Sequence, residues 1–269
     1  MGIPRLPLNA SPASVGLFCE DISFASRDDR VVLKGWYIAG DGDLALVIVC
    51  GGFQNRVDNV VGTLDLAHDL VRKGYNLLLF DLRGRGESEG EGRSLSNIER
   101  DIGGAVDYLK NRGYQANAIG IIGFCSGAAS SCIFASQEKV GALVLDGCFA
   151  SVRGMVYGQA TQRGIPRFLL NFFLPGLELV AKTMYGYDAV NPIDVVAEVP
   201  CPIFFIHEEY DYLISLEDNL QLYRASRNPA NLLWEVRGAA HSQGYKTNPS
   251  EYTKRIHEFF TTAFYKTPN

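Results

Sequence analysis

Short apolar runs alternate with amphipathic segments along most of this chain, and that alternation limits the possible folds more than any other feature. The run at 44–49 is continuous, which is typical of a strand buried on both faces. The segment 58–73 that follows it has the spacing of an amphipathic helix. Alternation of this kind indicates a mainly parallel sheet with helices on both faces. The runs predicted to be strands are 44–49, 75–80, 118–124, 142–145, 202–206 and 232–236.

The two ends of the chain and one internal segment complete the predicted organisation. Residues 18–24 and 31–38 are expected to form an opening hairpin, which brings the sheet to eight strands, and 251–264 a closing helix. Between about 150 and 190 the alternation lapses, so we expect a small helical cap inserted within a single domain that spans 1–269. The apolar residues of that segment are Met155, Phe168, Leu169, Phe172, Phe173, Leu177 and Val180.

Charge and hydropathy exclude several classes of partner. A formal net charge of −5 leaves no basic surface for nucleic acid or for an anionic membrane. The longest apolar run, around 168–174, is too short to span a bilayer, and the N-terminal residues lack the apolar core of a signal peptide. We therefore expect a cytoplasmic protein that acts on a small molecule, and a homo-oligomer is compatible with this expectation.

The cysteines give no sign of a metal centre or a disulfide framework. The six of them, at 19, 50, 125, 132, 148 and 201, are scattered and form no C-x-x-C pair. That spacing argues against a zinc knuckle and against a small secreted fold held by disulfides. We therefore expect neither a metal ion nor an organic cofactor.

The predicted strand 118–124 runs into the sequence GFCSG (123–127), which has the spacing of a nucleophile elbow, G-x-S-x-G, with cysteine in the centre. Glycines two residues before and after the nucleophile relieve crowding at this turn, and only Cys125 lies between such a pair. Ser126 would instead have the bulky Phe124 in one of those places. A helix N-terminus also favours a thiolate. Cys125 is thus the predicted nucleophile and the Ser126 N–H an oxyanion donor; the alternative is an inert cysteine at an ordinary strand–helix junction.

A catalytic base must come from four histidines. His241 lies in the small-residue loop GAAHS, beyond the end of a predicted strand, where open α/β sheets place their chemistry. His68 and His257 fall within predicted helices, and His207 ends a strand that leads into an acidic loop. Elimination favours His241 as the base.

The acid that orients such a base is less well determined by the residues themselves. Asp211 follows a strand end and precedes the base, so the chain order is nucleophile, acid, base. Glu208 and Glu209 are rivals in the same loop, although both could be solvated charges. Asp146, which ends the strand after the elbow strand, is the third rival.

Four motifs together make the chain resemble the α/β-hydrolases over nearly its full length. It is most similar to the short-capped bacterial serine-hydrolase-like group, which is prolyl-oligopeptidase-like and related to the dienelactone hydrolases. FDLRGRGESEG (80–90) resembles that family's turn after the fourth strand, and VCGGFQNR (49–56) its oxyanion loop. PCPIFFIHEEYDYLIS (200–215) resembles the acid loop, and GAAHS (238–242) the base loop. The glycines of RGRGESEG could by themselves suggest a phosphate-binding loop, but a structural turn is the preferred interpretation.

The resemblance implies an α/β-hydrolase fold with Cys125 as nucleophile, Asp211 as acid and His241 as base. It places the oxyanion hole at the backbone N–H groups of Phe53 and Ser126. The chain also departs from the family pattern. Cysteine replaces the usual nucleophilic serine, and the histidine that usually stands before the glycine of the oxyanion loop is replaced by a cysteine as well. Among the family's branches, dienelactone hydrolases and the bile-acid-conjugating acyltransferases use cysteine at the nucleophile position.

These features predict a hydrolase of carboxylic ester, thioester or lactone bonds that works through an acyl-enzyme on Cys125. An acyltransferase that uses the same cysteine is the first alternative. A binding protein that kept the fold and lost the reaction is the second, because a fold alone proves no activity.

Overall fold

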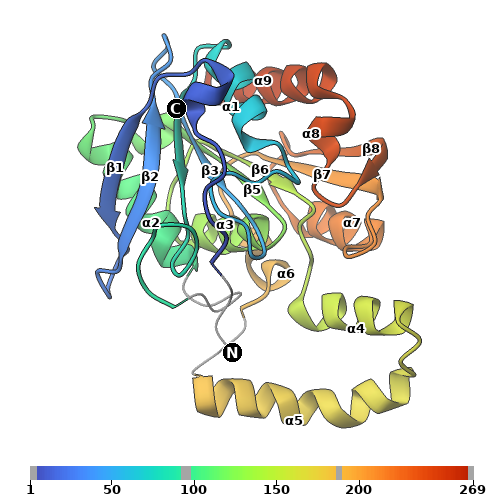
Figure 1. Cartoon of the computed structure of the whole chain (residues 1–269). Helices are drawn as coiled ribbons and strands as arrows, with labels where there is room; N and C mark the ends of the chain where they lie inside the picture. Colours follow the sequence, from blue (N-terminus) through green and yellow to red (C-terminus); the bar gives the residue numbers. More distant parts are fainter. Residues whose placement is uncertain (1–4, 92–97, 186–189, 266–269) are drawn as a thin grey trace.

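A computed structural model describes residues 5–91, 98–185 and 190–265, and the structural statements below concern those residues. They build one eight-stranded sheet in the order β1-β2-β4-β3-β5-β6-β7-β8 (Figure 1). β2 runs antiparallel to both its neighbours, and all the remaining pairs of neighbouring strands are parallel. The predicted mostly parallel, eight-stranded sheet is therefore confirmed. The strands are β1 (Glu20–Ala25), β2 (Val32–Ile38), β3 (Ala45–Val49), β4 (Asn76–Phe80), β5 (Ile119–Phe124), β6 (Ala142–Asp146), β7 (Ile203–Tyr210) and β8 (Leu232–Ala240).

Helices cover both faces of the sheet, so each central strand is buried on both sides as its continuous apolar sequence predicts. Along β3, Val47 packs into a core with α2 and α3, whereas Leu46 and Ile48 pack into a second core with α1 and α9. The helices are α1 (Thr63–Val71), α2 (Ile98–Asn111), α3 (Ser126–Gln137), α4 (Val152–Gln162), α5 (Arg167–Tyr185), α6 (Pro192–Val195), α7 (Leu216–Ala225), α8 (Gly244–Thr247) and α9 (Pro249–Tyr265). Single 3-10 turns are η1 (Pro12–Val15), η2 (Ala116–Ala118) and η3 (Val196–Glu198).

Three boundaries differ most from the sequence prediction. The helix expected from position 58 begins at Thr63, because the Asp58 side chain accepts the backbone N–H groups of Val60 and Val61 and closes a turn instead. The last two strands run four residues past the predicted ends at 206 and 236, to 210 and 240. Their pairing continues there through an irregularity between Glu208 and Tyr210.

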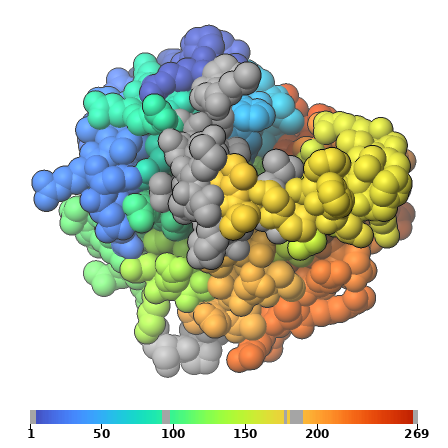
Figure 2. Space-filling model, turned by 90° about the horizontal axis from the view of Figure 1, so that it is seen from below, coloured from blue at the N-terminus to red at the C-terminus, as the bar shows by residue number. Residues whose placement is uncertain are grey.

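The described part of the segment from about 150 to 190 is mostly helical, and it stands at the end of the molecule where β6 finishes. α4 begins shortly after β6, and Figure 1 shows α5 below it, farther from the sheet. Figure 2 looks onto this end and shows the two helices, in yellow-green and yellow, on the surface. The residues Phe168, Phe172 and Phe173 are 69%, 76% and 58% exposed. That the segment acts as a cap stays a prediction, and its residues 186–189 and the Leu177 side chain lie outside the described part. No described helix is long and apolar enough to cross a membrane.

Candidate active site

The turn from β5 into α3 has the geometry of a strained elbow. Cys125 has φ 52° and ψ −117°, a conformation that costs a non-glycine residue about 1–3 kcal/mol. Its N–H donates to the Asp146 carbonyl on the adjacent strand at 2.9 Å. A Cβ added at Gly123 would lie 2.7 Å from the Ala128 Cα, and one at Gly127 only 2.4 Å from the Val49 carbonyl oxygen. The predicted need for these two glycines is therefore confirmed.

Asp211 and His241 meet at the carboxyl ends of β7 and β8. The His241 Nδ1 lies 2.6 Å from the Asp211 Oδ2, and the carboxylate is fully buried. The other oxygen, Oδ1, accepts the backbone N–H groups of Leu213 at 2.7 Å and Ile214 at 2.9 Å. The loop thus holds the carboxylate in place, and the carboxylate holds the imidazole with its Nε2 directed away from Asp211.

The imidazole also interacts with the Cys125 thiol. Burial by itself lowers the pKa of His241, but its hydrogen bonds to Asp211 and Cys125 outweigh burial and raise that pKa to about 10. Gly147 gives the ring its space, because a Cβ there would lie 3.2 Å from the His241 Cε1. The imidazole thus stands between the Asp211 carboxylate and the Cys125 thiol and interacts with both.

The loop after β3 packs directly against this elbow. A Cβ at Gly51 would lie 2.3 Å from the Phe124 carbonyl oxygen and 2.8 Å from the Cys125 Cβ. The Gly52 N–H donates to the Ser126 Oγ at 2.8 Å. Ser126 is the first residue of α3, so its own N–H has no partner within the helix. The loop that carries Phe53 therefore packs against the turn that carries Cys125 and Ser126, and the role of the Phe53 and Ser126 N–H groups as oxyanion donors stays a prediction.

The rival acids are occupied elsewhere. Asp146 accepts the Tyr252 hydroxyl at 2.6 Å, and Glu209 accepts the Gly238 N–H at 2.8 Å. Glu208 is completely buried next to Asp146. Burial, and then the neighbouring Asp146, raise the pKa of Glu208 well above its usual range, and burial raises that of Asp146 too. Such a pair favours a shared proton over two charges. Sequence inspection missed this pair, because its members lie on different strands.

The remaining histidines take no part in this arrangement. His68 lies beside Asp69 on α1, and the His257 Nδ1 is 3.0 Å from the Tyr75 hydroxyl. His207 is buried with its Nδ1 3.5 Å from the Asn219 Nδ2, and burial lowers its pKa. Among the described residues, His241 is the histidine hydrogen-bonded to the carboxylate of the acid loop.

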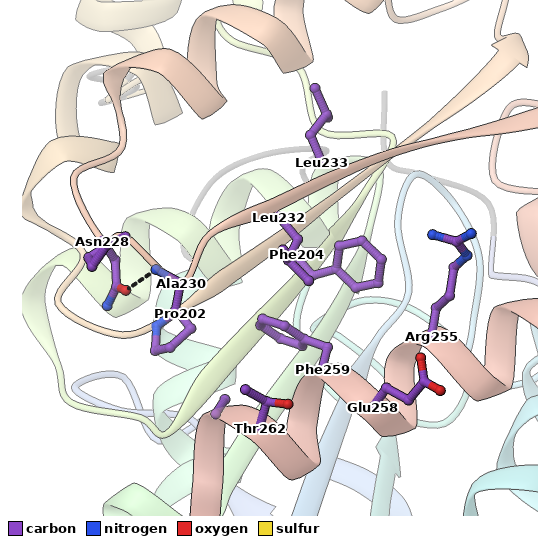
Figure 3. A pocket seen from close by; sticks show the side chains of 12 residues that line it. Pro202, Phe204, Asn228, Ala230, Leu232, Leu233, Arg255, Glu258, Phe259 and Thr262 are labelled. Carbon is purple, nitrogen blue, oxygen red and sulfur yellow. Dashed lines mark hydrogen bonds between the residues drawn. The ribbon is translucent and has the colours of Figure 1, made fainter. Parts of the chain in front are cut away.

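Outside this arrangement, the described residues offer no metal site but do form an apolar hollow. Within the described residues, no group of three or more His, Cys, Asp or Glu side chains is arranged to hold a metal ion. An apolar hollow of about 580 Å³ lies where β7 and β8 begin, against α9 (Figure 3). Phe204, Leu232 and Phe259 line it, so it is at the opposite end of these strands from His241. It is not part of the candidate active site.

Comparison with known proteins agrees with this geometry at the level of the fold. Residues 45–172 match the family model described as alpha/beta hydrolase fold. YqkD of Bacillus subtilis, a protein named as uncharacterized, is 28% identical over 234 residues, which cover 84% of this chain and 74% of YqkD. YfhR of Salmonella typhi, also named as uncharacterized, is 26% identical over 255 residues, with 84% of this chain and 78% of YfhR covered.

Solved structures extend the likeness over nearly the whole chain. The Pyrococcus furiosus esterase Pf2001 superimposes with a TM-score of 0.82 at 24% identity, and 98% of each chain is covered. The α/β hydrolase GrgF from a Penicillium species gives a TM-score of 0.72 at 20% identity, with 92% of this chain and 99% of GrgF covered. This chain therefore has the α/β-hydrolase fold.

Proposed function

We propose that this protein hydrolyses carboxylic ester, thioester or lactone bonds through a covalent acyl-enzyme on Cys125. The observation that carries the proposal is the line of three side chains at the carboxyl end of the sheet. The Cys125 thiol interacts with His241, whose Nδ1 lies 2.6 Å from a fully buried carboxylate of Asp211. The strained conformation of Cys125 supports it, because backbone strain of this kind concentrates at functional sites.

In the first half of the reaction, the Cys125 thiolate attacks the substrate carbonyl carbon, and the C=O electron pair moves onto the oxygen. The backbone N–H groups of Phe53 and Ser126 stabilise that oxyanion. The intermediate collapses, re-forms the carbonyl and expels the alkoxide or thiolate leaving group. The His241 imidazolium gives its proton to the leaving group, and an acyl–Cys125 thioester remains.

In the second half, the now neutral His241 takes a proton from water, and the hydroxide attacks the thioester carbonyl. A second oxyanion forms and collapses, which expels the Cys125 thiolate and releases the acid. Asp211 stays ionised throughout and stabilises the imidazolium whenever it forms. No step requires a further cofactor.

The substrate class rests on two supports. The structurally similar Pyrococcus furiosus protein is an esterase by name. The α4–α5 segment, which we assign as a cap within the single domain 1–269, exposes Phe168, Phe172 and Phe173. An apolar cap suits an acyl or aromatic group in the substrate.

Hydrolysis of short p-nitrophenyl esters by the purified chain tests the proposal. Cys125→Ala should abolish turnover and His241→Ala should leave little, whereas His257→Ala, on α9 and away from the site, should leave it unchanged. Wild-type rates in Cys125→Ala would refute the proposed nucleophile. If added amines compete with water for the acyl group, the acyltransferase alternative gains support.

A further inference from the structure

Arg85 lies in the turn that follows β4, and its side chain is completely buried. Two other buried arginines form ion pairs with carboxylates: Arg56 pairs with Asp81, and Arg83 pairs with Asp101. Among the described residues, Arg85 has no such carboxylate partner. Burying a cation without a counter-ion costs free energy. The burial of the Arg85 guanidinium must therefore be explained by an interaction other than an ion pair.

The guanidinium of Arg85 is instead directed at one backbone carbonyl. Its Nε and Nη2 donate to the Gly52 oxygen at 2.9 Å and 2.6 Å, and its Nη1 is buried without a partner. Gly52 lies 33 positions away in the chain, in the loop that packs against the elbow. Hydrogen bonds from an ionised donor are about twice as strong as neutral ones.

The Gly52 carbonyl belongs to the same peptide unit as the Phe53 N–H. A trans peptide is planar, so fixing the direction of its C=O fixes the direction of its N–H on the opposite side. The preceding peptide is held as well, because the Gly52 N–H donates to the Ser126 Oγ at 2.8 Å. Gly52 has φ 56°, a left-handed conformation that glycine adopts without steric cost, so the loop can turn here and direct its carbonyl toward Arg85.

We infer that Arg85 is a positioning residue, which orients and polarises the Gly52–Phe53 peptide so that the Phe53 N–H serves as an oxyanion donor. Withdrawal of electron density by the guanidinium at the carbonyl strengthens the N–H as a donor, because hydrogen bonds in a chain polarise one another. The positive charge also adds to the field felt by the oxyanion. This inference rests on the proposed hydrolysis and names a residue that acts through the loop rather than on the substrate.

The test compares two reactions of the same thiol. Ester hydrolysis needs the oxyanion hole, whereas alkylation of Cys125 by iodoacetamide forms no oxyanion. In Arg85→Met, kcat for p-nitrophenyl acetate should fall about 10- to 100-fold, somewhat less than the loss of a whole oxyanion donor. KM and the alkylation rate should each stay within about twofold, since ground-state binding and thiol reactivity do not depend on this peptide.

Two further variants separate positioning from bulk packing. Arg85→Lys keeps the buried charge and one donor, so it should retain more of kcat than Arg85→Met. Ser88→Ala is the control, because Ser88 is a buried residue of the same turn that bonds to Asp81 and Lys34 and not to the oxyanion loop. It should leave kcat and alkylation unchanged in the folded fraction.

Failure of the proposed function and failure of the inference about Arg85 give different experimental results. If the wild type hydrolyses no ester, thioester or lactone, the proposed function fails whatever Arg85 does. If the wild type is active and Arg85→Met keeps kcat, or loses alkylation in parallel with kcat, the inference about Arg85 is overturned. Should Arg85→Met not fold, the comparison of Arg85→Lys with wild type decides, because a kcat loss with unchanged alkylation supports the inference and equal kcat contradicts it.

Discussion

The Nδ1 of His241 and the Oδ2 of Asp211 lie 2.6 Å apart, at the ends of two adjacent parallel strands. The same carboxylate accepts two backbone N–H groups of its own loop through Oδ1. Asp211 thus serves two functions, because it organises the turn after β7 and it orients the imidazole. A substitution that keeps the first function and removes the second isolates the contribution of the charge.

Asp211→Asn is that substitution. The asparagine oxygen can still accept the N–H groups of Leu213 and Ile214, but the side chain loses its charge and favours the wrong imidazole tautomer. We expect kcat for ester hydrolysis to fall about 10³- to 10⁴-fold while the fold persists. The measurement is steady-state kinetics together with a thermal melt.

Glu209→Gln is the matched control for that experiment. Glu209 comes from the same loop and accepts the Gly238 N–H, which a glutamine oxygen can also accept. The kcat of the Glu209→Gln variant should stay close to that of the wild type. Activity within a factor of two of wild type in Asp211→Asn would show that another group orients His241.

Stability of the protein should depend on pH through the buried Asp146–Glu208 pair. Burial and Asp146 raise the pKa of Glu208 well above its value in the unfolded chain, near 4.5. The folded state therefore holds a proton that the unfolded state releases, and the free energy of unfolding falls as pH rises above that value. Glu208→Gln mimics the protonated acid and removes this loss. Its stability relative to wild type should increase as pH rises from 5 to 9.

Urea unfolding at several pH values measures that difference. Glutamine can donate an N–H toward Asp146, so the variant should keep the buried contact. A stability difference between Glu208→Gln and wild type that is constant over this range would contradict the shared-proton arrangement. A difference that moves in favour of the wild type at high pH would contradict it as well.

The close packing around the elbow glycines should make their substitution destabilising. A methyl group at Gly127 would lie 2.4 Å from the Val49 carbonyl oxygen, and the contact is with backbone that cannot turn aside. Gly127→Ala should destabilise the protein by about 1–3 kcal/mol or more through overpacking. Gly158→Ala, in α4, has no neighbour within 4 Å and should stabilise the helix by up to about 1 kcal/mol. Denaturant unfolding of both variants is the test, and equal stabilities would contradict the elbow geometry.

Much of the fold follows from patterns that are local in the chain. Continuous apolar runs predict strands buried on both faces, because burial on two sides leaves no place for polar alternation. The prediction fails where a side chain competes with the backbone, as Asp58 does when it closes a turn before α1. It also falls short at the ends of β7 and β8, because strand length there depends on pairing between segments distant in sequence.

The sequence by itself determined the centre of the elbow, because crowding around one residue depends on its neighbours in the chain. Glycines at 123 and 127 leave Cys125 as the residue that can occupy that turn. Only the tertiary structure decided which of four carboxylates reaches His241, since that depends on the register of β6, β7 and β8. It alone brought Arg85 to the Gly52 carbonyl, because a contact over 33 positions is formed by packing and leaves no periodic signal in the sequence.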